Sequence, residues 1–190
     1  MKPRSCTSVP HLSRRGLVAR FVFVALGLAW ATALWGQSTI FVTRHAQRGG
    51  FEPDPPLTAE GEAQAEALGR LLADADIKHI YSTDTLRTRQ TASPTSRRTG
   101  VLPVILPQPD FDGMVARVKE TLRPGESTLV VVHRETLPRM VKALSGVEIP
   151  PLASSEYSRL IAITIFPDGK CRVITLRQGL GNDEPAPKKS

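Results

Sequence analysis

The sequence predicts one α/β domain in which helices cover a mostly parallel sheet and an antiparallel hairpin is added at the C-terminal end. Two observations lead to this fold class. Short apolar runs rich in β-branched residues alternate with stretches of helical periodicity between Ser38 and Leu144. Two β-rich runs joined by a turn signal then follow. The length of 190 residues and the 41% hydrophobic content fit one domain with its own core.

The first part of the domain is expected to contain three strands and two helices. Strands are predicted at 38–43, 78–81 and 101–106, and Pro103 places the third at a sheet edge. A helix is predicted over 58–73, where Ala and Leu recur at helical spacing and Thr58 can cap the N-terminus. A second helix is predicted over 84–98, broken or kinked near Pro94.

The second part begins with a predicted helix at 111–122, which Asp112 can cap, and continues with the clearest strand, at 127–132. A helix is predicted at 136–144. The β-rich runs at 157–166 and 171–177 are joined by Pro167-Asp168-Gly169, which predicts a hairpin. We expect the domain to span residues 37–180, followed by a polar, disordered tail at 181–190.

Residues 1–36 have the layout of a secretory signal peptide. Five basic residues and no acidic residue occur in this segment, and residues 21–35 form an uncharged apolar run. Ala31-Thr32-Ala33 fits a cleavage signal, and Arg14-Arg15 resembles a twin-arginine export signal. A membrane span needs about 20 residues, yet an uncleaved N-terminal anchor stays open, as does a buried core helix. We expect an exported protein, periplasmic or secreted, that meets the membrane only through an uncleaved leader.

The charge distribution argues against a nucleic-acid partner. The net charge is +7, but five of the basic residues lie in the leader, and the rest of the chain is close to neutral. Only two cysteines, Cys6 and Cys171, and four histidines are present, without CxxC or HExxH spacing. We therefore expect neither a metal nor another cofactor.

Three motifs place cationic or nucleophilic side chains directly after predicted strands. Arg44 and His45 follow the first strand, Arg87 opens the helix after the second, and His133 follows the strand at 127–132. Each motif alone also fits a solvated arginine or a satisfied histidine at the edge of the core. Because ligands bind beyond the carboxyl ends of strands in open α/β sheets, the three can converge on one pocket. Such a pocket could neutralise a phosphate dianion and supply a nucleophile.

Together these motifs resemble the histidine phosphatase (phosphoglycerate mutase-like) superfamily, in particular its small bacterial phosphatases. The matching elements occur in the family order: Arg44-His45-Ala46, Leu57-Thr58-x-x-Gly61 with Gln64-Ala65, Arg87 with Thr91-Ala92, and His133 with Thr136-x-Pro138. The resemblance implies a three-layer α/β/α sandwich and hydrolysis of a small phosphomonoester.

The resemblance also implies the role of each site residue. His45 is the phosphoryl acceptor, and Arg44, Arg87 and His133 form the phosphate pocket. The chemistry requires His45 as a neutral imidazole with its second nitrogen held by a hydrogen bond, and we expect His133 to be protonated. Water would then hydrolyse the phosphohistidine.

Departures from the family pattern leave parts of this assignment open. Arg48 adds a positive group at the rim and is a further substrate-binding candidate, whereas Glu135 brings a carboxylate near the anion site unless it points away or pairs with Arg134. The proton donor is Asp112, Glu135 or no side chain at all. The physiological substrate also stays open. Phosphorylated lipopolysaccharide sugars and phosphohistidine proteins are alternatives, as is a non-catalytic protein that binds a phosphate ligand.

Overall fold

The computed structural model describes residues 36–50 and 52–178 of the chain. The predictions of a leader at 1–36 and of a tail at 181–190 fall outside these residues, apart from Gly36. Within the described part, no helix is both long and apolar enough to cross a membrane.

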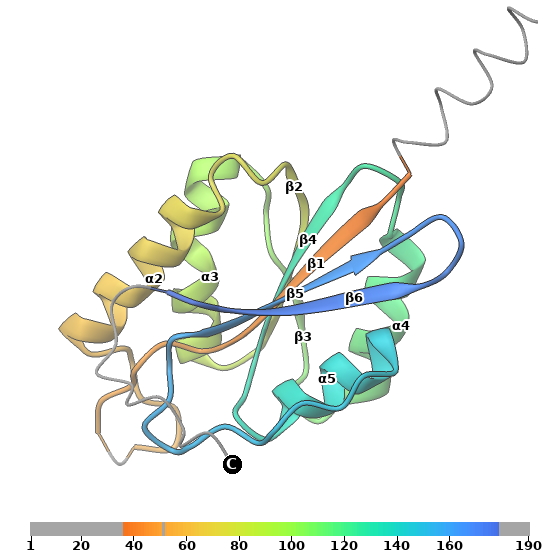
Figure 1. Cartoon of the computed structure of the whole chain (residues 1–190). Helices are drawn as coiled ribbons and strands as arrows, with labels where there is room; N and C mark the ends of the chain where they lie inside the picture. Colours follow the sequence, from red (N-terminus) through yellow and green to blue (C-terminus); the bar gives the residue numbers. More distant parts are fainter. Residues whose placement is uncertain (1–35, 51, 179–190) are drawn as a thin grey trace, which may run out of the picture. The chain divides into compact units, whose positions relative to one another are not determined.

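Six strands form one mixed sheet in the order β3-β2-β4-β1-β5-β6 (Figure 1). Adjacent strands from β3 to β1 are parallel, whereas β5 pairs antiparallel with both β1 and β6. The predicted mostly parallel sheet with an antiparallel C-terminal hairpin is thus confirmed. The strands are β1 (Ser38–Arg44), β2 (Ile77–Thr83), β3 (Val104–Leu106), β4 (Ser127–Val132), β5 (Arg159–Ile165) and β6 (Cys171–Arg177).

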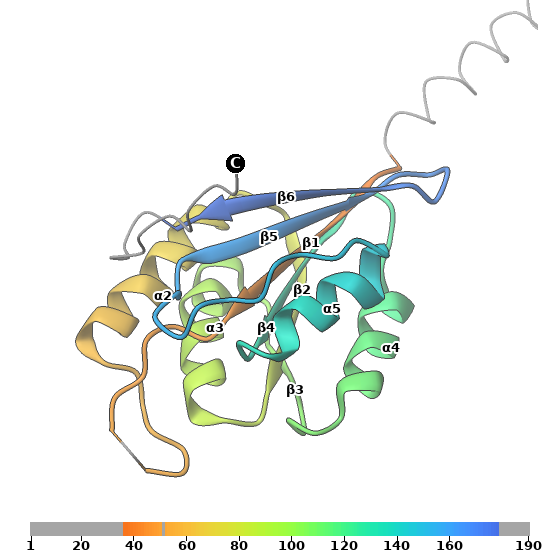
Figure 2. The ribbon, with the colours of Figure 1, turned by 60° about the horizontal axis from the view of Figure 1, so that its bottom comes forward.

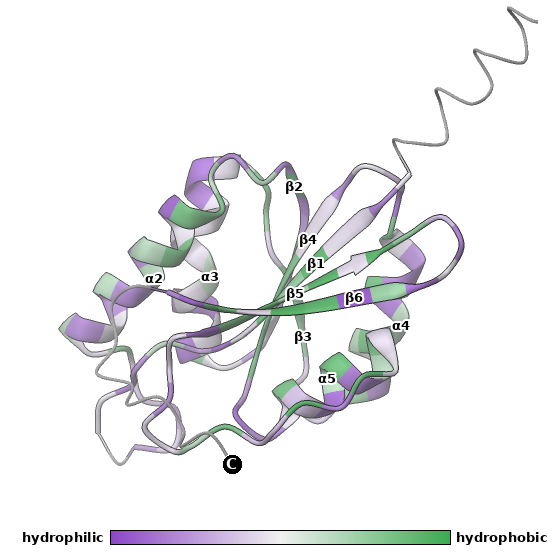
Figure 3. Cartoon of the chain, in the orientation of Figure 1, coloured by the Kyte–Doolittle hydropathy of each residue, from purple (hydrophilic) through white to green (hydrophobic). Residues whose placement is uncertain are grey.

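Two pairs of helices cover the two faces of the sheet and complete the three-layer sandwich (Figure 2). The helices α2 (Ala59–Leu71) and α3 (Leu86–Thr99) cover one face, and α4 (Phe111–Thr121) and α5 (Thr136–Ser145) cover the other. Each interface has its own apolar cluster, one around Leu68 and Leu129, the other around Val130 and Met140. Figure 3 shows that hydrophobic residues concentrate on the middle strands and on the inward side of α5.

The start of α2 agrees with the prediction, whereas the course of α3 at Pro94 differs from it. Thr58 caps α2 as predicted, because its side chain accepts a hydrogen bond from the Gly61 N–H. A break or a kink was predicted near Pro94, and the break is wrong, since α3 continues through this residue. Pro94 is buried against Gly69 of α2, where a Cβ would lie 3.0 Å from the proline, so close helix packing offsets the missing backbone donor.

The cap of α4 is Asp110, not Asp112. The Asp110 carboxylate accepts a hydrogen bond from the Gly113 N–H over 3.0 Å. Asp112 lies in the first helical turn and is exposed. Either acid could have been the cap on sequence grounds, and the turn at Pro107 and Pro109 starts the helix after Asp110.

Strand direction decides what meets at the edge of the sheet. Arg44 at the end of β1 pairs with Val132 at the end of β4, and Ser82 near the end of β2 pairs with Val131. The carboxyl ends of β1, β2 and β4 therefore lie together. Because β5 is antiparallel to β1, the segment that leads into β5 reaches this same edge.

Candidate active site

A cavity of about 530 Å³ opens at this edge of the sheet. It brings together five of the six residues predicted for the site, namely Arg44, His45, Arg48, Arg87 and His133. Asp112 is not among the residues that line it. The lining consists of Arg44, His45, Arg48, Glu52, Pro53, Arg87, Gln108, His133, Arg134, Glu135, Ser154 and Tyr157.

His45 is held as a neutral imidazole with one nitrogen free. Its Nδ1 lies 2.8 Å from the Ala46 carbonyl oxygen, which can only accept, so Nδ1 carries the proton and Nε2 keeps its lone pair. Burial, reinforced by the charges of Arg44 and Arg87, lowers the pKa of His45 to about 3. The side chain is therefore neutral at pH 7, as a nitrogen nucleophile requires.

The chain after β1 is anchored by the residues that carry the sequence motifs. The Ala46 N–H donates to Thr91 Oγ1 over 2.9 Å, and the Gln47 N–H donates to the buried Gln64 side chain over 2.9 Å. A Cβ at Gly61 would lie 2.0 Å from the Gln47 carbonyl oxygen. Gly61, Gln64 and Thr91 thus fix the backbone around His45 and do not touch the ligand space themselves.

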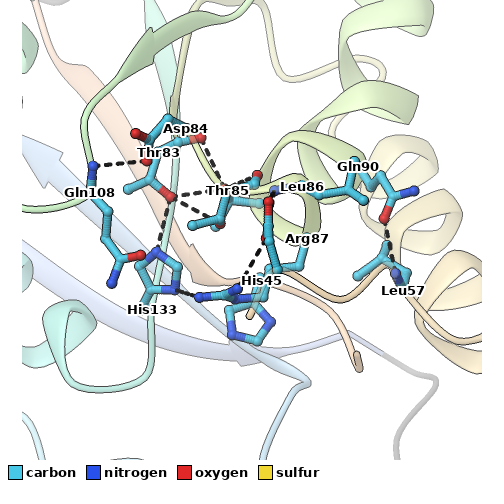
Figure 4. Close-up of polar contacts among 12 residues, drawn as sticks. His45, Leu57, Thr83, Asp84, Thr85, Leu86, Arg87, Gln90, Gln108 and His133 are labelled. Atoms are coloured by element: carbon cyan, nitrogen blue, oxygen red, sulfur yellow. Dashed lines mark hydrogen bonds and ion pairs between the residues drawn. The ribbon is translucent and has the colours of Figure 1, made fainter. Parts of the chain in front are cut away.

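His133 lies beside His45, with ring centroids 5.5 Å apart, and contacts Arg87 and Thr83 (Figure 4). Arg87 Nη2 lies 3.5 Å from His133 Nδ1, and Thr83 Oγ1 lies 3.0 Å from His133 Nε2. Burial first, and then the Arg87 charge, lower the pKa of His133 to about 4. The expectation of a protonated His133 is therefore wrong, because the ring is buried and lies beside the Arg87 guanidinium.

Arg87 lies in the first turn of α3 and its side chain is only 13% exposed. One edge of its guanidinium contacts the Asp54 carboxylate, with Nη1 3.3 Å from Oδ1. The same carboxylate accepts from the Leu86 N–H, at 3.0 Å and 2.8 Å for its two oxygens. Thr85 provides no side-chain cap for α3, so Asp54 takes over this role from a distant loop.

Arg44 is oriented by the segment that precedes β5. Its Nη1 donates to the main-chain carbonyls of Ser154, over 2.8 Å, and Glu156, over 2.9 Å. The Tyr157 ring stacks on the guanidinium, with Cζ 3.9 Å from the ring centroid. Tyr157 also forms part of the cavity wall beside His45.

A buried ion pair fixes the shape of this segment. Arg159 Nε and Nη2 each donate to a different Glu156 oxygen over 2.7 Å, and both side chains are only 10% exposed. Arg159 Nη1 also donates to the Pro150 carbonyl over 2.8 Å. Such bidentate geometry is stiff, so the carbonyls that hold Arg44 have defined positions.

The remaining lining residues supply charge of both signs at the mouth. Arg48 is exposed there. Glu135 pairs with Arg134, Oε1 lying 2.7 Å from Nη2, which answers the concern that an unpaired carboxylate would repel phosphate. Gln108 and Glu52 also line the cavity. Sequence reasoning missed both, because neither belongs to a strand-end motif.

The arrangement can bind an oxyanion and attack it. The buried guanidinium of Arg44, the partly buried guanidinium of Arg87 and two imidazoles face one polar cavity, and the imidazole of His45 has a free nitrogen. Among residues 36–50 and 52–178, no group of three His, Cys, Asp or Glu side chains could hold a metal ion. The cationic side chains that line the cavity are arginines, namely Arg44, Arg48, Arg87 and Arg134.

Comparison with known proteins finds similarity to one phosphatase superfamily. Residues 36–109 match the model of the histidine phosphatase superfamily (branch 1). This segment contains Arg44, His45 and Arg87. The resemblance stated from the sequence is thereby confirmed. A search of curated proteins finds no match.

Solved structures show the same fold at low sequence identity. The protein histidine phosphatase SixA complexed with tungstate aligns with a TM-score of 0.61 and 19% identity, over 74% of this chain and 97% of that one. A mycobacterial glucosyl-3-phosphoglycerate phosphatase aligns with a TM-score of 0.56 and 14% identity, over 75% of this chain and 100% of that one. The domain thus has the size of small bacterial phosphatases, and at these identities the likeness concerns the fold.

Proposed function

We propose that the protein is a phosphatase that hydrolyses a phosphomonoester through a phosphohistidine on His45. The observation that carries this proposal is the neutral His45, whose free Nε2 belongs to a cavity lined by Arg44, Arg87 and His133. Nε2 attacks phosphorus, the bond to the leaving oxygen breaks, and the phosphoryl group moves to His45. The arginines stabilise the charge on the phosphoryl oxygens in both steps. Water then attacks the phosphohistidine and releases phosphate and the free imidazole.

The decisive experiment traps the intermediate. During turnover of p-nitrophenyl phosphate, wild-type protein should carry phosphate that is labile in acid, stable in base and mapped by mass spectrometry to His45. His45→Ala should lose both the label and the activity. His79→Ala is a matched control, because His79 pairs with Glu126 and does not line the cavity. Full activity of His45→Ala would contradict the mechanism, and wild-type protein that binds phosphate without turnover would indicate a binding protein.

A second candidate substrate is phosphohistidine in a protein. The observation that favours it is the small number of carboxyl groups that could act as a general acid. Of the described carboxyl groups, only Glu52 and Glu135 line the cavity, and Glu135 is paired with Arg134. Asp112, one of the candidates for protonating a leaving oxygen, is not among the residues that line the cavity. A site without a dedicated acid favours leaving groups better than an alkoxide. Parallel kcat/KM measurements on p-nitrophenyl phosphate, an alkyl phosphate and a phosphohistidine peptide would rank these classes.

We also propose export, on the basis of the basic and apolar leader in the sequence. N-terminal sequencing of the secreted protein should begin between Leu34 and Ser38. A full-length product in the cytosol would contradict export and would leave the catalytic proposal untouched.

A further inference from the structure

Three threonine hydroxyls form a connected chain behind His133 (Figure 4). Thr83 Oγ1 lies 3.0 Å from His133 Nε2 and 2.8 Å from Thr88 Oγ1. Thr85 Oγ1 lies 2.9 Å from Thr88 Oγ1. Thr83 and Thr88 are fully or almost fully buried, so their single protons must be shared among these partners.

The direction of the hydrogen bonds follows from groups that can only accept or only donate. Thr88 Oγ1 lies 3.0 Å from the Thr83 carbonyl oxygen and 2.9 Å from the Thr85 carbonyl oxygen, so its proton is used there. The Thr88 oxygen then accepts the proton of Thr83. The Thr83 oxygen is left to accept, and its nearest remaining neighbour is the Nε2–H of His133 at 3.0 Å, whereas Thr85 Oγ1 lies farther away at 3.5 Å.

The contact between Arg87 and the other ring nitrogen of His133 indicates the same tautomer. A guanidinium only donates, so Arg87 Nη2 facing His133 Nδ1 requires a lone pair on Nδ1. A neutral imidazole has one lone-pair nitrogen and one N–H. Both contacts therefore specify the tautomer with the proton on Nε2 and the lone pair on Nδ1, beside Arg87.

We propose that Thr83 and Thr88 are positioning residues that fix the tautomer and the ring orientation of His133, so that Nδ1 faces Arg87 and the phosphoryl site. They act through His133 and do not touch the substrate. The consequence for the reaction rests on the proposed phosphatase function. A bound phosphate would meet a lone pair on Nδ1 and would have to bring the proton that joins the two.

The test measures the tautomer in the free protein, where turnover plays no part. In ¹⁵N-labelled full-length protein near pH 7, His133 Nε2 should give a protonated-type resonance and Nδ1 an unprotonated-type one, with His133→Asn for assignment. Thr83→Val removes the acceptor of Nε2–H, and Thr88→Val frees the Thr83 proton. Both variants should lose the single tautomer, whereas Thr83→Ser should retain it.

Activity gives the second measurement. We expect kcat to fall at least about tenfold in Thr83→Val, the scale seen when a group that orients a functional histidine is removed, and to recover in Thr83→Ser. Thr95→Val is a matched control, because the Thr95 hydroxyl is buried in α3, the helix of Thr88, without a hydrogen-bond partner in the described part of the chain. It should change neither tautomer nor kcat.

Two results would overturn the proposal: a wild-type His133 with the proton on Nδ1, or Thr83→Val that keeps both the tautomer and the full kcat. Wild-type protein without phosphatase activity would instead refute the proposed function, and the NMR measurement would still decide the role of the threonines.

Discussion

Asp54 Oδ1 lies 3.3 Å from Arg87 Nη1, although the two residues are 33 positions apart in the chain. A carboxylate beside a phosphate-binding arginine would ordinarily be expected to compete with the substrate. Here the same carboxylate also receives the Leu86 N–H, so it joins the loop after β1 to the start of α3. The contact holds one side of the guanidinium and leaves Nη2 directed at His133.

We therefore predict that Asp54→Asn weakens catalysis. An asparagine can still accept from Leu86 but no longer attracts Arg87 by charge. The carboxylate is about half exposed, so the loss should be modest, about two- to fivefold in kcat/KM, as for a partly screened pair. Asp74→Asn, an exposed substitution just beyond α2, serves as the control. A lower KM with unchanged kcat in Asp54→Asn would show that Asp54 merely opposes the phosphate.

The Glu156–Arg159 pair should matter for activity through Arg44. Glu156→Gln leaves a buried arginine without its charge partner, a loss of about 3 kcal/mol in the free energy of unfolding. It also loosens the carbonyls that hold Arg44, so kcat/KM should fall. Glu148→Gln, which removes a surface partner of Lys142, is the control for loss of an ion pair alone.

A double-mutant cycle separates the two effects of Glu156→Gln. In an Arg44→Ala background, Glu156→Gln should still lower the free energy of unfolding, measured with urea, but should cost little further activity. Additive losses of activity would show that Glu156 acts on the site by a route other than Arg44.

Stability should rise between about pH 4 and pH 6.5. The unfolded chain binds protons at His45 and His133 near pH 6.5, but the folded chain does so only at about pH 3 and about pH 4. Between these values the unfolded state holds more protons, so acid favours unfolding, by on the order of 1 kcal/mol per pH unit for each histidine. Urea unfolding at several pH values measures this slope. Replacing both histidines by Asn should flatten it, and an unchanged slope would contradict the neutral state of the two rings.

Gly61→Ala should disturb both fold and site. The added Cβ would meet the Gln47 carbonyl oxygen at 2.0 Å, and because the nearest atoms all belong to the Gln47 backbone, they leave little room for adjustment. We expect a loss of about 2 kcal/mol or more in the free energy of unfolding, as for overpacking, with lower kcat because the chain beyond His45 shifts. Glu62→Ala, exposed on the same helix, is the control. Wild-type stability of Gly61→Ala would contradict the close approach.

Turnover should not depend on a metal ion. Arginine groups provide the positive charge in the cavity, so activity should survive EDTA and overnight dialysis. Loss of activity that zinc or magnesium restores would contradict this prediction.

The periodicity and apolar runs of the sequence were sufficient to predict most of the fold, because the helices bury one apolar face against the sheet and the central strand β4 is buried along its whole length. The strand at 127–132 and the helix start at Thr58 follow directly from local signals. Pro94 shows the limit of such signals: its effect depends on Gly69 in another helix, which no local pattern reveals. Asp110 and Asp112 show another limit. They lie two positions apart, and the geometry of the preceding turn determines which of them caps α4.

The candidate site likewise combines residues that the sequence predicts with contacts that it does not reveal. Arg44, His45, Arg87 and His133 follow strands, so topology alone predicts that they meet. The supporting contacts were missed because they use main-chain carbonyls, as at Ser154, or link distant segments, as Asp54 does. The misjudged charge of His133 has a similar origin, because its low pKa comes from burial beside Arg87, which only the assembled site creates.

The reversal of direction at β5 has a consequence for how this site can change. Because the segment before β5 holds Arg44 through backbone carbonyls, the residues at Ala153 and Ser154 can be replaced without removing the acceptors. Ser154 and Tyr157 face the cavity from this same segment. The cavity wall at Ser154 can therefore vary in side chain while Arg44 keeps its main-chain acceptors, which makes this position the natural target for altering substrate preference.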